Sequence, residues 1–386
     1  MENTVQQQSG TLVIIGGALR VDNSAVWERI VMLAGGKGAK IAVFPCAASR
    51  PAHSAALTIQ ALQKYGACAF MVPVAVKLEG CDCRTAADDP AIAEQVRTAD
   101  GVYFVGGDQG RITQALLRPD GSRSLVLDAV WELYRKGGVI AGNSAGAAIM
   151  STWMFDDAPA VLPALKRGIS DDGEMAPGLG FIGPDVFIDQ HLVIRGRFAR
   201  MLPAMLKMGY RTGLGIDENT AMVVSGGSDV EIVGYRGAVL IDLSQATVNE
   251  GTFNISNARL SYLDNGDRYN FHSGLLTLPA DKREGRLELG PPYRNGARFY
   301  PAILANATLL DLLQALACSR QQRAVGLAFG GPDDDMPALG FEFTFSKAED
   351  SEAYFSSLRG AETYTVMNMR LDVRPVEMQL PLYRHI

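Results

Sequence analysis

The sequence predicts an α/β fold in which a mostly parallel, doubly wound sheet carries a nucleophile on a turn between a strand and a helix. Through residue 150, short apolar runs alternate with segments of helical spacing, which is typical of a parallel sheet covered on both faces. In addition, the apolar run that starts at Val139 ends in the sequence GNSAG over residues 142–146. This sequence matches the G-x-S-x-G pattern of a nucleophile elbow, with Ser144 as the nucleophile.

The first 150 residues supply the alternating elements. We predict strands over Gly10–Gly17, Lys40–Pro45, Cys68–Val74, Gly101–Val105 and up to Ser144, and helices over Ala25–Leu33, His53–Tyr65, Ala91–Thr98, Arg111–Leu117 and Leu125–Arg135. Ligands of such sheets bind at the carboxyl ends of the strands. The glycine pairs at 16–17 and 106–107 and the elbow all lie at such ends. Neither glycine pair completes G-x-G-x-x-G, so we expect no dinucleotide cofactor.

The rest of the chain predicts a strand-rich continuation and a small C-terminal α+β appendage. Its expected parts are a long loop over Asp156–Gly180, a strand over Asp185–Leu192, a helix over Phe198–Met208, two strand-like runs within Leu214–Val224, and strands between Asp229 and Leu278. The charged segment Lys282–Pro292 is typical of a linker. After it we predict a helix over Pro301–Cys318 and strands over Phe341–Phe345 and Tyr364–Val373. We therefore divide the chain into residues 10–282 and 293–386.

Composition excludes several classes of protein. The net charge of the 386-residue chain is -6, and no stretch is dense in Lys or Arg, so we expect no nucleic-acid partner. No run approaches ~20 apolar residues, and the polar N-terminus has no apolar h-region, so we expect no membrane span and no secretory signal. The five cysteines are irregularly spaced and have no histidine at ligand spacing nearby. We therefore expect no metal site and reduced thiols in the cytoplasm.

A serine nucleophile needs a base to accept its proton and an acid to orient that base. Two of the four histidines, at the start of a helix and at the C-terminus, are by default solvated. His191 and His272 remain as candidates. A carboxylate at 217–218 followed by His272 has the order Ser, acid, His of α/β-hydrolases, whereas His191 with Glu218 has the order Ser, His, acid. Because geometry and not order defines a triad, the residues by themselves leave both open.

Five motifs in order resemble the cyanophycinases, which are peptidase S51-type serine hydrolases related to the α-aspartyl dipeptidases. They are GGDQ (106–109), GNSAGA (142–147), DQH (189–191), RGRFAR (195–200) and GIDENTA (215–221). The resemblance extends from about residue 10 to about residue 280. A set of five motifs in the same order is far more specific than the elbow pentapeptide.

The resemblance implies a catalytic triad and a substrate site without a cofactor. The triad is Ser144, His191 and Glu218, and the oxyanion donors are the N–H of Ala145, expected from the elbow itself, and the glycine turn at Gly107 and Asp108. The residues implied in or around the substrate site are Gln109, Asp189, Gln190, Arg195, Arg197 and Arg200. Cyanophycinases cleave cyanophycin, multi-L-arginyl-poly-L-aspartate, and release β-Asp-Arg dipeptides.

The charges of the chain agree with such a substrate. Guanidinium groups bind carboxylates in bidentate fashion, so the arginine cluster is a suitable clamp for the carboxylates of the polymer. The substrate guanidinium needs acidic partners. The candidates lie in the predicted long loop and are Asp156, Asp157, Asp171, Asp172 and Glu174.

We therefore expect a cytoplasmic, homodimeric serine exopeptidase that hydrolyses cyanophycin or β-Asp-Arg oligomers through an acyl-enzyme. One alternative is an α-aspartyl dipeptidase, which applies the same chemistry to a free N-terminal aspartate. Another is a catalytically silent member that binds a peptide or partner through its C-terminal segment. Incubation with cyanophycin granules, followed by mass spectrometry of the soluble products, separates these alternatives.

Overall fold

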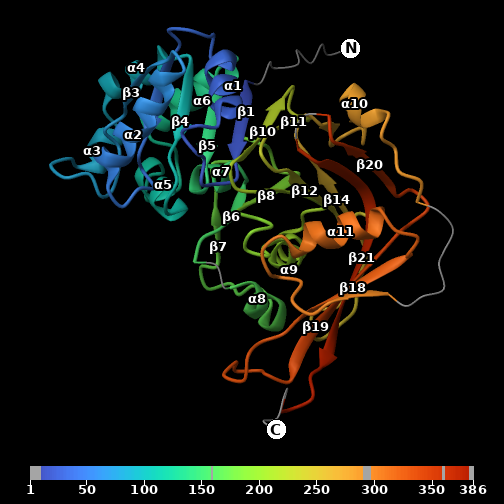
Figure 1. Ribbon diagram of the computed structural model, residues 1–386. Coiled ribbons are helices and arrows are strands. Elements are labelled where there is room, and N and C mark those ends of the chain that lie inside the picture. The colour runs from blue at the N-terminus through green and yellow to red at the C-terminus, as the bar shows by residue number, and fades with distance from the viewer. Residues whose placement is uncertain (1–9, 158–159, 290–296, 359–360, 382–386) are drawn as a thin grey trace, which may run out of the picture.

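The computed structural model describes residues 10–157, 160–289, 297–358 and 361–381 (Figure 1). Its first sheet has nine strands in the order β16-β15-β11-β10-β1-β5-β4-β2-β3. They are β1 (Thr11–Ile15), β2 (Lys40–Phe44), β3 (Cys68–Met71), β4 (Gly101–Phe104), β5 (Val139–Asn143), β10 (Thr220–Ser225), β11 (Asp229–Gly234), β15 (Arg268–Asn270) and β16 (Leu276–Thr277). Strands β1 to β5 are parallel. The other four continue the sheet from β1 as successive antiparallel pairs, β10 on β1, β11 on β10, β15 on β11 and β16 on β15. The predicted α/β class is confirmed.

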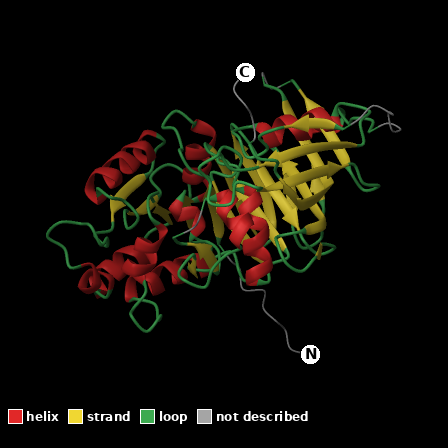
Figure 2. Cartoon of the chain, turned by 90° about the horizontal axis from the view of Figure 1, so that it is seen from below, coloured by secondary structure: helices red, strands yellow, loops and turns green. Residues whose placement is uncertain are grey.

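Helices cover both faces of the parallel part of this sheet, as expected for a doubly wound fold (Figure 2). They are α1 (Ser24–Leu33) and α2 (Pro51–Lys64) on one face, and α3 (Cys83–Ala87), α4 (Pro90–Arg97), α5 (Gln109–Leu116) and α6 (Leu125–Arg135) on the other. Along β1, Val13 packs in the core under α1, whereas Leu12 packs in the core under α6. Successive side chains of a strand point to opposite faces, so an apolar run is buried on both sides.

The second sheet has ten strands, eight of them in the order β17-β18-β19-β21-β14-β12-β9-β8. Its strands are β8 (Val186–Gln190), β9 (Thr212–Ile216), β12 (Ala238–Asp242), β13 (Thr247–Val248), β14 (Ile255–Leu263), β17 (Arg298–Tyr300), β18 (Arg323–Ala328), β19 (Leu339–Ser346), β20 (Glu352–Ser356) and β21 (Thr363–Glu377). Leu240 of β12 faces the core shared with the first sheet, and its neighbour Val239 faces α9 (Phe198–Met208) and α11 (Thr308–Ala317).

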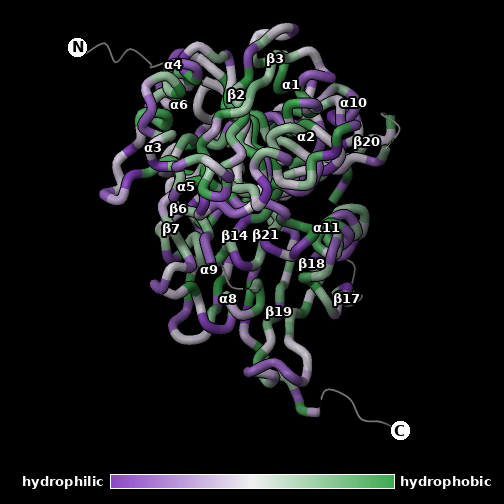
Figure 3. Tube along the Cα trace, turned by 90° about the vertical axis from the view of Figure 1, so that its left-hand side faces the viewer, coloured by the Kyte–Doolittle hydropathy of each residue, from purple (hydrophilic) through white to green (hydrophobic). Residues whose placement is uncertain are grey.

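Figure 3 shows the apolar β2 inside the first layer and hydrophilic stretches along the connecting segments. None of the described helices has the length and apolarity needed to cross a membrane.

The segment predicted as one long loop contains regular structure. It includes α8 (Val161–Arg167) and β7 (Met175–Pro177), and β7 pairs with β6 (Trp153–Phe155). A strand of three residues is too short to show a period of two, and α8 is only seven residues long. Tertiary packing therefore forms these elements where local pattern does not predict them.

The predicted division between residues 282 and 293 does not separate two sheets. Strand β21 from the C-terminal segment pairs with β14 on one side and with β19 on the other. Leu260 of β14, for example, lies opposite Met369 of β21, and both side chains are fully buried. Without residues 293–386, β14 would be an edge strand with an unpaired apolar surface. Residues 290–292 of the predicted linker lie outside the described part of the chain.

A buried ion pair lies where the linker was expected to begin. Lys282 belongs to α10 (Ala280–Arg283) and is 1% exposed. Its Nζ lies 2.7 Å from Oδ1 of Asp267. The other oxygen of Asp267 accepts a hydrogen bond of 2.5 Å from Thr365 of β21. This cluster thus joins α10 and the turn before β15 to the C-terminal segment.

We expect Lys282→Met to lower the free energy of unfolding by about 3–5 kcal/mol, because it leaves the buried Asp267 carboxylate without its cation. The matched control is Arg286→Met. Arg286 also forms an ion pair of 2.7 Å, with Glu352, but the two side chains are 64% and 39% exposed, so its loss should change stability by less than about 1 kcal/mol. Urea unfolding followed by circular dichroism measures both values. Equal effects of the two variants would contradict a stabilising function of the buried pair.

Candidate active site

Ser144 lies on a strained turn between β5 and α7 (Ala145–Ala148), with φ 54° and ψ -106°. The two flanking glycines are required by close backbone contacts. A Cβ atom on Gly142 would lie 2.0 Å from the carbonyl oxygen of Gly146, and a Cβ atom on Gly146 would lie 2.5 Å from the carbonyl oxygen of Phe104. A positive φ at a non-glycine residue costs about 1–3 kcal/mol and is typical of functional sites.

A chain of two short hydrogen bonds starts at the serine. Ser144 Oγ lies 2.8 Å from Nε2 of His191, and Nδ1 of the same imidazole lies 2.6 Å from Oε1 of Glu218. With a carboxylate on one side, Nδ1 carries the proton and Nε2 is free to accept the serine proton. His272 is exposed, and its backbone N–H donates to Asn270 in the turn after β15. The structure therefore brings His191 and Glu218, and not His272, to Ser144.

The carboxyl end of β1 holds the three loops that carry these side chains. The carbonyl oxygens of Ile15 and Gly16 accept hydrogen bonds from the backbone N–H groups of Ser144 and His191, and Gly17 accepts one from Asn219, next to Glu218. A Cβ atom on Gly17 would lie 2.1 Å from Cε1 of the imidazole. From the sequence, this glycine pair is predicted to lie at the end of a strand, but its contact with the catalytic loops is not predicted. The only feature in the sequence that could have indicated such a close contact is the pair of glycines directly after a buried strand.

The imidazole is held in its neutral form. Burial lowers the pKa of His191 below its ordinary value of about 6.5, and the nearby charges of Arg195 and Arg197 lower it further, against the opposing effect of the hydrogen bond that the imidazole donates to Glu218. A neutral imidazole at pH 7 is the form that can take a proton from a hydroxyl group.

Two backbone N–H groups remain for an oxyanion. Within the described residues, the N–H groups of Ala145 and Gly107 donate no hydrogen bond. The N–H of Asp108, which the resemblance implied as a third donor, is instead bound to the carbonyl oxygen of Ala47 at 3.0 Å. That prediction is corrected, because a donor already used by the fold cannot meet an oxyanion. The Asp108 side chain caps α5 through the N–H of Arg111.

A cavity of about 680 Å³ opens beside Ser144, and arginines form part of its wall. Arg195 is exposed, and its side chain forms no hydrogen bond or ion pair with any described residue; only its backbone N–H donates, to the carbonyl oxygen of His191. Arg197 donates to the backbone oxygen and to Oε1 of Gln190, at 2.9 and 2.6 Å. Burial lowers the pKa of Arg197 to about 10, so its guanidinium is still charged at pH 7. A substrate carboxylate in the cavity can therefore bind two guanidinium groups, that of Arg195, whose side chain has no partner among the described residues, and that of Arg197, which Gln190 holds in place.

Asp189 and Arg200 form a supporting pair. Both side chains are buried, and Nε and Nη2 of Arg200 each lie 2.8 Å from a carboxylate oxygen of Asp189. Arg200 reaches the cavity wall, where its guanidinium stacks 4.1 Å from the ring of Phe155, whereas Asp189 does not line the cavity. Nothing in the sequence pointed to Phe155, because its contact with Arg200 depends on the fold.

Gln109 fixes the acidic part of the cavity wall. Its Nε2 donates to the carbonyl oxygen of Phe155 at 2.7 Å, which holds Asp156 and Asp157 at the cavity. Burial raises the pKa of Asp156, and the charges of Asp108 and Asp157 raise it further. Of the other predicted acids, Asp171 pairs with Lys207 and Glu174 accepts the N–H of Ser170, and neither lines the cavity.

Among the side chains with described positions, no three His, Cys, Asp or Glu residues are grouped to hold a metal ion.

Comparison with known proteins identifies relatives of this chain. Residues 12–232, which include the three hydrogen-bonded side chains of the site, match the model of Peptidase family S51. The cyanophycinase of Geminocystis herdmanii is 31% identical over 273 residues, which are 68% of this chain and 94% of that protein. The cyanophycinase of Trichormus variabilis is 29% identical over 292 residues, 72% of this chain and 91% of that protein. A solved peptidase from an acI-B1 Actinobacterium has a TM-score of 0.48 and 23% identity, and covers 69% of this chain and 98% of its own.

Proposed function

Because the chain belongs to peptidase family S51 and is a serine-type peptidase, we propose that it hydrolyses cyanophycin to β-Asp-Arg dipeptides. The hydrogen-bond chain from Ser144 through His191 to Glu218, open to a cavity walled by arginines, carries this proposal. The relatives named cyanophycinase support the choice of substrate.

In the proposed mechanism, Ser144 attacks the backbone amide carbonyl of an aspartate whose β-carboxyl carries the arginine, while Nε2 of His191 accepts the serine proton. The imidazolium, stabilised by Glu218, then gives this proton to the leaving amine. The N–H groups of Gly107 and Ala145 stabilise the oxyanion of the tetrahedral intermediate. Water hydrolyses the acyl-enzyme in the second half of the reaction, again with His191 as the base.

We assign substrate recognition to the charged side chains of both signs that line the cavity. The unpaired Arg195, together with Arg197 on its Gln190 anchor, binds substrate carboxylates, since guanidinium and carboxylate match in bidentate geometry. Asp156 and Asp157 are the acidic partners for the substrate guanidinium. Asp189 and Arg200 position this cluster through their buried pair. The homodimer and the cytoplasmic location stay predictions.

We expect the protein to cleave β-linked Asp-Arg oligomers at least about 100-fold faster, in kcat/KM, than oligomers of ordinary α-linked Asp-Arg. In the β-linked oligomer the arginine branches from the side-chain carboxyl, whereas in the α-linked oligomer it occupies the main chain. The scissile main-chain carbonyl is therefore placed differently relative to the substrate charges that the cavity binds, and a displacement of ~1 Å at the reacting centre can lower the rate ~100-fold. Mass spectrometry of the soluble products, first from cyanophycin granules and then from the two synthetic oligomers, measures this preference.

The Ser144→Ala variant is the blank for both substrates. Comparable cleavage of the α-linked oligomer would exclude the cyanophycinase assignment and favour an α-aspartyl dipeptidase. No cleavage of either oligomer by the wild-type protein would favour a catalytically silent member of the family.

The acid limb of the kcat/KM profile should lie below pH 6.5. The base must be neutral to accept a proton, and the pKa of His191 is lowered by burial and by two nearby arginines, so protonation of the base begins only at lower pH. Arg195→Ala removes a positive charge that disfavours the imidazolium, and it should therefore move this limb to higher pH. Initial rates at low substrate concentration between pH 4 and 8 report the position of the limb.

Asp156 is a second group in the cavity that titrates on the acid side, since its pKa is raised. Asp156→Asn is therefore the control for the pH profile, and it should leave an acid limb in place. If that variant loses the limb, the limb belongs to Asp156 and the assignment to His191 is contradicted.

A further inference from the structure

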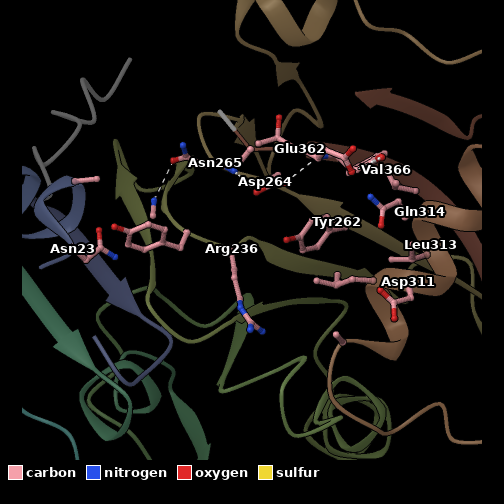
Figure 4. Close-up of a pocket in the computed structure, with 18 of the residues that line it drawn as sticks. Asn23, Arg236, Tyr262, Asp264, Asn265, Asp311, Leu313, Gln314, Glu362 and Val366 are labelled. Atoms are coloured by element: carbon pink, nitrogen blue, oxygen red, sulfur yellow. Dashed lines mark hydrogen bonds between the residues drawn. The ribbon is translucent and has the colours of Figure 1, made fainter. Parts of the chain in front are cut away.

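A second cavity, of about 520 Å³, lies away from the serine site and depends on the C-terminal segment (Figure 4). Its walls come from the start of α1, from the β11–β12 turn and β14, and from α11 and the start of β21. The volume is within the ~300–1,000 Å³ that is usual for small-molecule sites. Because α11 closes one side, the cavity requires residues beyond the segment that matches family S51.

Arg236 supplies a partly free guanidinium at one side of the cavity. Its Nη1 donates to Oδ2 of the buried Asp217 at 3.0 Å. The Nε and Nη2 groups donate to no described residue, and the side chain is 39% exposed. An arginine anchored at one nitrogen keeps an edge with which it can bind a carboxylate in bidentate fashion.

Tyr262 presents an unpartnered hydroxyl group to the same space. The residue is only 6% exposed, and its hydroxyl makes no hydrogen bond with any described residue. Figure 4 shows the hydroxyl end of the ring directed toward the Arg236 side of the cavity. Burial raises the pKa of Tyr262, so the hydroxyl is protonated and can donate. The hydroxyl is not among the fully buried side-chain atoms that lack a partner in the described residues, so it is open to the cavity and can bind a ligand there.

Helix α11 supplies the opposite side, with different chemistry. Asp311 is exposed there and forms no ion pair or side-chain hydrogen bond within the described residues. Gln314 follows one turn later on the same helix face, as residues three apart do. Leu310 and Leu313 add apolar surface to the wall. Figure 4 shows Arg236 and Tyr262 on one side of the space and Asp311, Leu313 and Gln314 on the other.

We propose that this cavity binds a small zwitterion whose carboxylate meets Arg236 and the hydroxyl of Tyr262, and whose cationic end meets Asp311 and Gln314. An apolar stem between the two charges would lie against the leucines of α11. Free amino acids with a cationic side chain have this chemistry. A ligand in this cavity would also affect the serine site, because Arg236 is hydrogen-bonded to Asp217, the residue before Glu218.

Isothermal titration calorimetry with L-arginine on the full-length protein tests the proposal. We expect one saturable site per chain, with agmatine, which lacks the carboxylate, and L-norvaline, which lacks the cationic side chain, each bound more weakly. Asp311→Asn should weaken L-arginine binding about tenfold or more and leave L-norvaline unaffected. Arg236→Met should weaken L-arginine but not agmatine.

Two further variants distinguish binding in this cavity from binding in the serine site or on the protein surface. Gln314→Trp fills the cavity without touching the Arg236–Asp217 pair, and should abolish binding even if Arg236→Met alters the fold. Glu349→Gln removes an exposed charge elsewhere and should leave binding unchanged. Binding that persists in Gln314→Trp and disappears in Arg195→Ala would locate the ligand in the serine site. That result, or no saturable binding up to about 10 mM, would overturn the proposal.

Discussion

Ser144→Ala should lower kcat by roughly 10⁴- to 10⁶-fold, because removing the nucleophile of a triad costs about as much as removing the whole triad. The fold should survive the change. Alanine is smaller than serine, and the contacts that hold the turn are made by the backbone: the N–H of Ser144 donates to Ile15, and the carbonyl oxygen of Ser144 accepts from residues of α7. Single-turnover assays with cyanophycin measure the loss.

Thermal unfolding of the same variant separates loss of chemistry from loss of structure. Since alanine and serine both carry a Cβ atom and tolerate the positive φ of this position about equally, we expect a change in Tm of only a few degrees. Turnover within about tenfold of wild type would contradict the proposed acyl-enzyme and require a water nucleophile activated by another group.

His191→Asn should be nearly as damaging as the change at Ser144, by roughly 10⁴- to 10⁶-fold in kcat. The imidazole is the only group hydrogen-bonded to both Ser144 and Glu218 among the residues with described positions. Asparagine keeps a polar side chain of similar size but provides no base near neutral pH. The loss should therefore appear in kcat, with KM changed much less, because proton transfer stabilises the transition state and not the bound substrate.

The matched control for this variant is His272→Asn. His272 is exposed on the turn after β15, so its replacement should leave kcat within about twofold of wild type. A larger loss at His272 than at His191 would contradict the proposed triad and restore the Ser, acid, His order that the residues by themselves leave open.

The spaced arginines of residues 195–200 are not equivalent. Arg195 is free, Arg197 is anchored on Gln190, and Arg200 is neutralised by Asp189 inside the protein. A buried charge is stable only with its partner, so Arg200 supports the site by keeping Asp189 satisfied. The spacing of the motif therefore does not by itself say which guanidinium meets a substrate.

Local pattern was sufficient for the fold class and for the elbow. Continuous apolar runs that end in glycine predict buried strands, because a strand inside a parallel sheet is covered on both faces and carries apolar side chains on both. The elbow is also local, because the contact between Gly142 and Gly146 that demands glycine lies within the pentapeptide itself. These features could be predicted from sequence, and the matching α/β sheet confirms the fold class.

The choice of base required more than local pattern. Ser144 and His191 are 47 residues apart along the chain, His191 and Glu218 are 27 residues apart, and no periodicity relates them. The residues left His191 and His272 open, and the resemblance to a family implied His191. The distances in the structure place only His191 beside the serine. Three further features could not be predicted from local pattern, since each depends on contacts between separate loops. They are the hydrogen bond that occupies the N–H of Asp108, the Asp189–Arg200 ion pair, and the attachment of three loops to the end of β1.

Neighbouring residues along the chain were thus enough to predict the α/β sheet, the elbow with Ser144 and the short set of charged residues from which a site could be built. Contacts across the fold selected which of those residues meet. They also paired β21 with β14, far earlier in the chain, and placed α11 over a second cavity. The physical reason is that burial and strand period are properties of neighbouring residues, whereas strand pairing and side-chain contact are selected by packing of the whole chain.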